Sequence, residues 1–217
     1  MTVSLATPLN QIRLAPGSAI ALSGLTWQHY QALLQDLGDD RSTRIAYNEG
    51  VLEIRLPSKP DEIINRLLAK IIFTLAEALG MDINELGSTT FNREDLDKGI
   101  EPDSCFYIQN ANVVQGFNPE IPHRLPPDLA VEVDISNSSE KKMVIYQALG
   151  IPELWVYRRG KVAFRILQEQ HYVETSESQV FPRINQQQLN QWIQLRETGS
   201  DVTVVRAVRQ FCQQLSS

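Results

Sequence analysis

Apolar residues recur at the three- and four-residue spacing of an amphipathic helix in several stretches of the chain. The first predicted helix covers residues 27–37 and follows Thr26, a typical N-cap residue. A longer helix is predicted over residues 61–79, where the acidic side chains of Asp61 and Glu62 in the first turn suit the helix dipole. The same spacing predicts further helices over residues 138–149, 186–196 and 202–215.

Shorter apolar runs separate these helices and are typical of β-strands. Residues 44–47 and 51–56 form a predicted hairpin, because Gly50 stands in the short turn between them, where a positive φ is needed. Residues 57–60 hold two prolines and break the pattern, and residues 109–127 form a polar loop with four prolines. Further strands are predicted over residues 83–91, 104–108, 129–135, 153–157, 161–167 and 171–174. This succession predicts an α/β fold with a mixed β-sheet flanked by helices.

The 217 residues suit one domain with terminal appendages. Residues 1–24 have no clear periodicity and are expected to form an irregular N-terminal arm. Residues 25–180 hold the sheet and its helices. Residues 181–217 are expected to be a helical extension that packs on the same domain.

Composition indicates a cytoplasmic protein. Only two cysteines occur, which is too few for the disulfide framework of a small secreted domain. The first 14 residues lack the basic start and apolar core of a signal peptide, and no apolar run is long enough to span a membrane. The net charge of −6 disfavours a protein that coats nucleic acid by bulk charge, although basic residues can still be concentrated on one rim.

The most informative strand is rich in carboxylates. Side chains alternate between the two faces of a strand, so residues 128–135 divide into an apolar face and an acidic face. The acidic face carries Asp128, Ala130, Glu132 and Asp134. Neighbouring carboxylates oppose one another's ionisation, unless water, a lysine or a divalent cation compensates their charge. The face is therefore either solvated or part of an enclosed site.

Two other segments supply candidate partners for this strand. Asp103 follows a proline and enters an apolar strand; it is either a turn residue or a metal ligand fixed at a strand end. Lys142 shares a helix face with Ile145 and Tyr146, a face that should pack on the sheet and direct the lysine toward the acidic strand. The alternative is a lysine that extends from a helix end into solvent. Glu62 is a weaker candidate, because dipole matching alone explains an acid at a helix start.

Several other classes of site have no support in the sequence. The three histidines are scattered without the spacing of a zinc site. The sequence contains no phosphate-binding glycine pattern and no Gly-x-Ser-x-Gly motif.

The chain resembles the Uma family of putative restriction endonucleases, which belong to the PD-(D/E)XK nuclease superfamily. The resemblance extends over about residues 25–175. It rests on the order and spacing of these stretches: Leu25-Thr26-Trp27-Gln28-His29-Tyr30, Gly50-Val51-Leu52-Glu53-Ile54, Gly87-Ser88-Thr89-Thr90-Phe91, Glu101-Pro102-Asp103, Pro127-Asp128-Leu129-Ala130-Val131-Glu132-Val133-Asp134, Lys142 with Tyr146, and Gly150-Ile151-Pro152-Glu153-Leu154-Trp155.

This resemblance implies a restriction-endonuclease-like fold and specific roles. Asp103 would be the aspartate of the first half-motif and Glu132 the acid of the second, and both would bind a divalent metal, Mg²⁺ or Mn²⁺. The backbone carbonyl of Val133 would be a further ligand. The superfamily pattern has a lysine two positions after the acid, where this chain has Asp134, a possible third acid; Lys142 resembles a lysine that has migrated to the next helix.

The resemblance further implies hydrolysis of DNA that leaves a 5′-phosphate. A homodimer is expected, because two sites cut two strands most easily. Two alternatives stay open at this stage. One is a catalytically inactive nuclease fold that serves as a nucleic-acid or protein binding module. The other is a metal-dependent phosphoesterase for small molecules, over which the loop at 109–127 could close.

Overall fold

The computed structural model describes residues 12–38, 41–134 and 139–215. The helices are α1 (Trp27–Leu37), α2 (Lys59–Ala78), α3 (Ser139–Leu149), α4 (Gln186–Gln194) and α5 (Asp201–Leu215). The strands are β1 (Ala19–Ser23), β2 (Arg44–Asn48), β3 (Val51–Arg55), β4 (Asn84–Gly87), β5 (Phe91–Arg93), β6 (Lys98–Ile100), β7 (Ser104–Tyr107), β8 (Leu129–Val133), β9 (Glu153–Arg158), β10 (Lys161–Gln168) and β11 (His171–Thr175).

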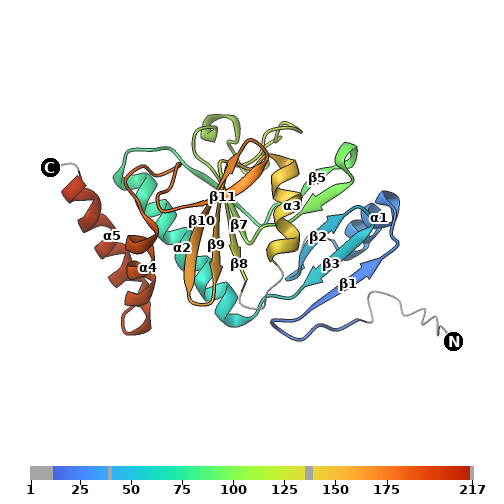
Figure 1. Ribbon diagram of the computed structural model, residues 1–217, viewed down its shortest axis with the longest axis horizontal. Coiled ribbons are helices and arrows are strands. Elements are labelled where there is room, and N and C mark those ends of the chain that lie inside the picture. Colours follow the sequence, from blue (N-terminus) through green and yellow to red (C-terminus); the bar gives the residue numbers. More distant parts are fainter. Residues whose placement is uncertain (1–11, 39–40, 135–138, 216–217) are drawn as a thin grey trace.

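These strands form two sheets (Figure 1). The larger sheet has the order β11-β10-β9-β8-β7-β4, and it is mixed because β8 and β9 run parallel while its other pairs are antiparallel. The smaller sheet has the order β1-β3-β2-β6-β5 and is antiparallel. The predicted α/β class with a mixed sheet flanked by helices is confirmed, and the smaller sheet is an addition to it.

Helices cover both faces of the larger sheet. Leu129, Val131 and Val133 of β8 pack against α2 and, with α4 and α5, form the main core. The opposite face of β8 packs against α3 through Ala130. α1 packs on the smaller sheet, and the two form a separate hydrophobic core. α3 contacts both sheets, so the acidic face of β8 is enclosed rather than open to water.

The strands differ from the prediction in three regions of the chain. Residues 83–91 form two strands in different sheets, because the chain turns after Gly87, which has a φ of 58°. The strand β6 has three residues and was not predicted; Gly99 is needed there, because an added Cβ would lie 2.2 Å from the Tyr30 hydroxyl oxygen. Residues 19–23 of the expected irregular arm form an edge strand that pairs with β3.

Helix boundaries also differ. α2 begins at Lys59 rather than at Asp61, because the Ser58 hydroxyl accepts the backbone amide of Asp61 and the Asp61 carboxylate accepts that of Ser58. Pro60 fits in this first turn, where its missing N–H has no helical partner. The predicted start of α3 at Ser138 lies outside the described residues.

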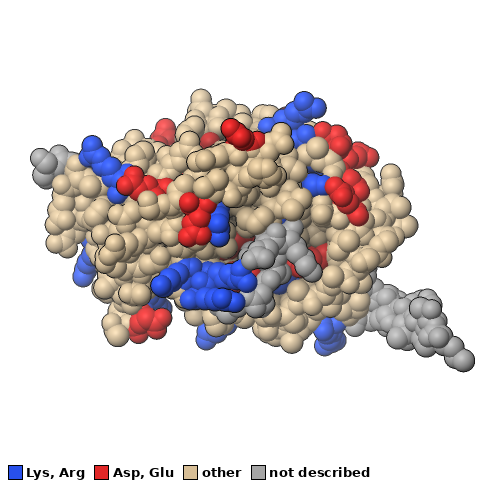
Figure 2. Space-filling model, viewed as in Figure 1, with Lys and Arg blue, Asp and Glu red and all other residues tan. Residues whose placement is uncertain are grey.

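Acidic and basic side chains are interspersed over most of the face shown in Figure 2. The clearest exception is a group of basic side chains below and left of the centre, over the β9–β10 turn. No helix within the described ranges combines the length and the hydropathy that a membrane span requires.

Candidate active site

Asp103 and Glu132 come together because their strands are neighbours. β7 and β8 are antiparallel, with Ser104 opposite Val131. One further step along this register brings Asp103 level with Glu132, and directly opposed residues direct their side chains to the same face of a sheet. Both side chains are buried, with 4% and 1% of their surface exposed.

Asp103 is held firmly in place. Its Oδ2 accepts the backbone amide of Val133 at 2.9 Å, and its own amide donates to the carbonyl of Val131 at 3.1 Å. The side chain of Asn65 on α2 donates to the backbone carbonyl of Asp103 at 3.1 Å. A buried aspartate with these contacts is a fixed group at a strand end, and not an exposed turn residue.

Lys142 reaches Glu132 from α3. Its Nζ lies 3.1 Å from Glu132 Oε2, and the Tyr146 hydroxyl donates to Glu132 Oε1. Lys142 is buried, so it does not extend into solvent and it points toward the acidic strand, as its helix face predicted. Burial raises the pKa of Glu132 above its usual range, and Lys142 is the strongest influence that lowers it again. The amine and the hydroxyl therefore offset part of the cost of burying this carboxylate.

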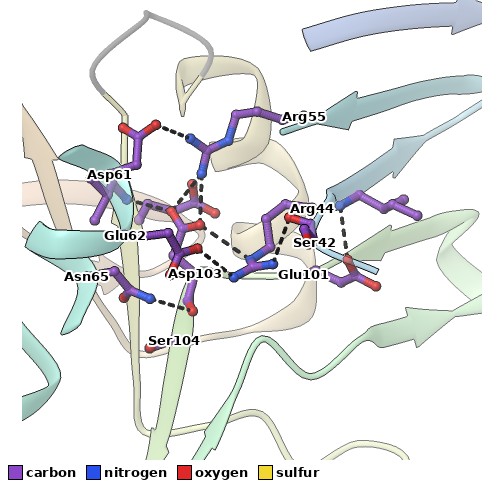
Figure 3. Close-up of polar contacts among 12 residues, drawn as sticks. Ser42, Arg44, Arg55, Asp61, Glu62, Asn65, Glu101, Asp103 and Ser104 are labelled. Atoms are coloured by element: carbon purple, nitrogen blue, oxygen red, sulfur yellow. Dashed lines mark hydrogen bonds and ion pairs between the residues drawn. The ribbon is translucent and has the colours of Figure 1, made fainter. Parts of the chain in front are cut away.

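Two arginines of the smaller sheet complete the surroundings of Asp103 (Figure 3). The Arg55 Nη2 lies 2.8 Å from both oxygens of the Asp103 carboxylate. Arg44 Nε lies 3.5 Å from Asp103 Oδ1. Arg55 is itself buried, and Asp103 is the strongest of the carboxylates that raise its pKa against the effect of desolvation. The smaller sheet thus supplies positive charge to acids of the larger one.

The start of α2 lies on the other side of Arg55. Asp61 Oδ2 is 3.6 Å from Arg55 Nη1, and Asp61 is buried. Glu62, the candidate expected on this helix, has 39% of its side chain exposed and pairs with Arg44 at 3.3 Å. Figure 3 shows both acids near Asp103, with Asn65 one helical turn below them. Asp61, rather than Glu62, is the acid that α2 buries beside the cluster.

The remaining acids of residues 128–134 have different surroundings. Asp134 is buried and is one of the carboxylates that raise the pKa of Arg55. Asp128 accepts the amide of Ile108 at 2.7 Å and both amide groups of Asn110, so it fixes the loop after β7 instead of joining the cluster. Asp128, Glu132 and Asp134 are all buried, so the acidic face of this strand is not solvated.

The donor chemistry of this cluster suits a hard divalent cation. Among the described residues, four buried carboxylates act on the Arg55 guanidinium, those of Asp61, Asp103, Glu132 and Asp134, and Glu132 also pairs with Lys142. The side-chain oxygens Asp61 Oδ1 and Asn65 Oδ1 are buried without a hydrogen-bond partner among the described residues. Within those same ranges, no three histidine, cysteine or acidic side chains already form a metal-binding group. Ligands would therefore include backbone or amide oxygens beside the two central carboxylates.

The backbone of Val133 offers one such oxygen. The amide and carbonyl groups of a strand residue point to the same neighbouring side. The amide of Val133 donates to the side chain of Asp103, the residue that directly precedes β7. The Val133 carbonyl therefore faces the cluster side of β8 and not β9.

Sequence reasoning missed Arg44, Arg55 and Asn65, and it explained Asp61 by the helix dipole alone. One signal was available: the predicted turn sets the hairpin register, in which Arg44 lies directly opposite Arg55. Like charges directly opposite each other destabilise a strand pair, so these two arginines require nearby carboxylates.

A mixed sheet that carries a buried Asp–Glu–Lys cluster on two neighbouring interior strands is the arrangement expected of a nuclease of the restriction-endonuclease type. The Uma2 family, described as putative restriction endonucleases, matches residues 27–205, and the chain belongs to this family. The family supports a nuclease function.

A solved structure shows the same fold. It is the crystal structure of a putative nuclease belonging to DUF820 from Anabaena variabilis ATCC 29413, determined at 1.96 Å resolution. The two chains share 14% sequence identity with a TM-score of 0.54, and the likeness covers 78% of this chain and 99% of that one. No curated protein sequence matches the chain.

Proposed function

We propose that this protein is a divalent-metal-dependent endonuclease that hydrolyses phosphodiester bonds of DNA, with Asp103, Glu132 and Lys142 as its catalytic residues. The single observation that carries the proposal is the Lys142–Glu132 contact at 3.1 Å, beside an aspartate from the neighbouring strand. Burying these groups together is costly for stability. Catalysis that requires these three side chains would explain why the protein has a buried cluster that lowers its stability.

Asp103, Glu132 and the carbonyl of Val133 would hold the ion, Mg²⁺ or Mn²⁺, with Asp61 and Asn65 as nearby oxygen donors. When bound, the ion would neutralise charge at the scissile phosphate and lower the pKa of a water molecule. The two acids supply the negative charge that selects a cation at this place. Arg55 now contacts both oxygens of Asp103, so an ion at this carboxylate has to share it with the guanidinium or displace it.

Lys142 has two roles in this proposal. Its ammonium group stabilises negative charge that develops on the phosphate during attack. As an ammonium group, Lys142 also orients the attacking water; in the neutral amine form, its Nζ would instead accept the proton of that water. In either case the proton of the water passes on to solvent, and the leaving 3′-oxygen takes up a proton from solvent. Tyr146 holds the Glu132 carboxylate in position through its hydroxyl group. Asp134 and Glu62 stay secondary candidates.

The test is cleavage of supercoiled plasmid and linear duplex DNA with added Mg²⁺ or Mn²⁺. Asp103→Asn and Glu132→Gln should reduce cleavage to background, and Lys142→Met should reduce its rate by roughly 10²–10⁴-fold. Asp128→Asn is the matched control, because Asp128 is a buried acid on the same segment that lies outside the cluster. Products should carry 5′-phosphates. Full activity in the Asp103 and Glu132 variants, with folding intact, would refute the assignment.

One observation favours a second function. The Asp103 and Glu132 carboxylates are already paired with Arg55 and Lys142, which is sufficient for a cluster that only stabilises the fold. The protein would then be a nuclease fold that binds nucleic acid without cutting it. DNA binding by the wild type without cleavage at any concentration of either metal would identify this alternative.

A further inference from the structure

The β9–β10 hairpin carries an unusual density of positive charge for a protein of net charge −6. Arg158, Arg159 and Lys161 are three of the four residues 158–161. Arg158 and Lys161 are directly opposite each other across the hairpin. Arg159 and Lys161 are exposed, and neither forms an ion pair with a described residue. Arg159 and Lys161 therefore present two positive charges to solvent at the end of this hairpin, where an anion can reach them.

The basic residues continue along the sheet. Lys161 and Arg165 are separated by an even number of positions on β10, so they share a face with Arg158. All three line a groove of about 520 Å³, together with Met143 and Gln147 of α3 and with His171. Among the described residues that line the groove, Glu174 is the carboxylate, and it is paired with Arg165 at 3.0 Å. Figure 2 shows basic side chains gathered at this place.

This groove opens beside the candidate active site. β8 and β9 run parallel, and Glu132 is opposite Val156, so Arg158 lies on the same sheet face as Glu132. Two residues along the strand and one strand spacing separate them, which amounts to about 8 Å between their Cα atoms. The backbone amide of Asp134 donates to the carbonyl of Tyr157 at 2.9 Å, so the two strand ends are joined there. The hairpin is therefore fixed relative to the acids.

The turn presents its charges in a defined direction. Arg159 and Gly160 both have positive φ, 52° and 82°, as in the tight two-residue turns that connect twisted antiparallel strands. A short turn of this kind leaves little freedom to the backbone. The backbone of Arg159 at the tip therefore has a defined position relative to β9 and β10, from which its side chain extends into solvent.

We propose that the β9–β10 hairpin and the groove behind it bind the phosphate backbone of the DNA substrate next to the scissile phosphate. The inference rests on the proposed function and adds the surface that positions the substrate. A local row of cations can neutralise phosphates where the net charge of the whole chain cannot. Contacts of this kind fix the register of a nucleic acid on a protein without reading its sequence.

The test is the salt dependence of binding. A fluorescent duplex is titrated with the full chain in the presence of EDTA, so that no cleavage occurs, at a series of NaCl concentrations. The double variant Arg159→Ala/Lys161→Ala should weaken binding about tenfold or more at low salt. It should also reduce the slope of log Kobs against log [NaCl] by about 1–2, because each lost phosphate contact contributes roughly 0.9. Both side chains are exposed, so the variant should fold; its melting temperature checks this.

The matched control is Arg206→Ala/Arg209→Ala, which removes two exposed cations from α5 on the opposite side of the larger sheet. It should leave both the affinity and the slope unchanged. Equal effects of the two double variants, no effect of the hairpin variant, or no binding by the wild type would each overturn the inference. Cleavage is measured separately with Mg²⁺: binding that depends on the hairpin without any cleavage would refute the proposed function alone, and cleavage with hairpin-independent binding would refute the inference alone.

Discussion

Replacing Lys142 by methionine should destabilise the protein strongly, because it leaves Glu132 buried without its main cationic partner. Lys142 Nζ and Glu132 Oε2 are 3.1 Å apart, and their side chains are 5% and 1% exposed. At an effective dielectric constant of about 20, two charges at this distance attract each other by about 5 kcal/mol before desolvation. Breaking a buried pair on one side typically costs about 3–5 kcal/mol. We expect Lys142→Met to lower the free energy of unfolding by that amount near pH 8.

The pH dependence of this loss has a definite sign. Lys142 lowers the pKa of Glu132, so that pKa is higher in the variant than in the wild type. The stability difference should be complete above the pKa of the variant. It should shrink as pH falls through the two pKa values, because a protonated Glu132 needs no cation. A double variant Glu132→Gln/Lys142→Met should recover part of the loss, with a coupling energy of about 2–3 kcal/mol.

The assay is urea unfolding followed by tryptophan fluorescence, with Trp155 as a buried reporter. It is carried out on the wild type, both single variants and the double variant. A loss below about 1 kcal/mol for Lys142→Met, as measured for exposed ion pairs, would refute the reasoning, as would additivity of the two substitutions.

Three further predictions follow from other buried groups. Arg55→Met should lower stability without metal and raise Mn²⁺ affinity roughly tenfold, because it removes a cation that competes with the metal at Asp103. Melting curves measure the stability and calorimetry measures the affinity; weaker Mn²⁺ binding by the variant would contradict the prediction. Asp128→Ala should cost about 2–4 kcal/mol in urea unfolding, because it leaves three amide donors near β7 without an acceptor, whereas a loss under about 0.5 kcal/mol would be inconsistent with that role. Burial raises the pKa of the Cys105 thiol to about 12 and also raises that of Cys212. Both should react with dithionitrobenzoate only after unfolding, and fast reaction of the native protein would show the burial to be wrong.

The sequence predicted those parts of the fold whose signal is local. The periodicity of α1, α2 and α5 and the turn around Gly50 depend on neighbours in the chain, and the structure has them close to the predicted bounds. β6 was missed because a three-residue strand with a central glycine has no alternation to detect. Its position depends on Tyr30, whose ring leaves room there only for a glycine.

The sequence predicted the acids Asp103 and Glu132 together with Lys142, but not the arginines around them. Glu132 and Lys142 lie ten residues apart in adjacent elements, so strand alternation and the helix face were enough to direct each toward the other. Arg55 is 48 residues from Asp103 and belongs to the other sheet. Long-range pairs of this kind depend on how the two sheets pack against each other. The periodicity of the sequence carries no information about that packing. The paired arginines of the hairpin indicated only that anions were needed nearby.

The most direct test of the central claim is calorimetric titration of the metal-free protein with Mn²⁺. If Asp103 and Glu132 share one ion, the wild type should bind Mn²⁺ and the variants Asp103→Asn and Glu132→Gln should each lose that binding, while Asp128→Asn retains it. Equal Mn²⁺ binding by the wild type and both cluster variants, or no binding by the wild type, would contradict a shared metal site.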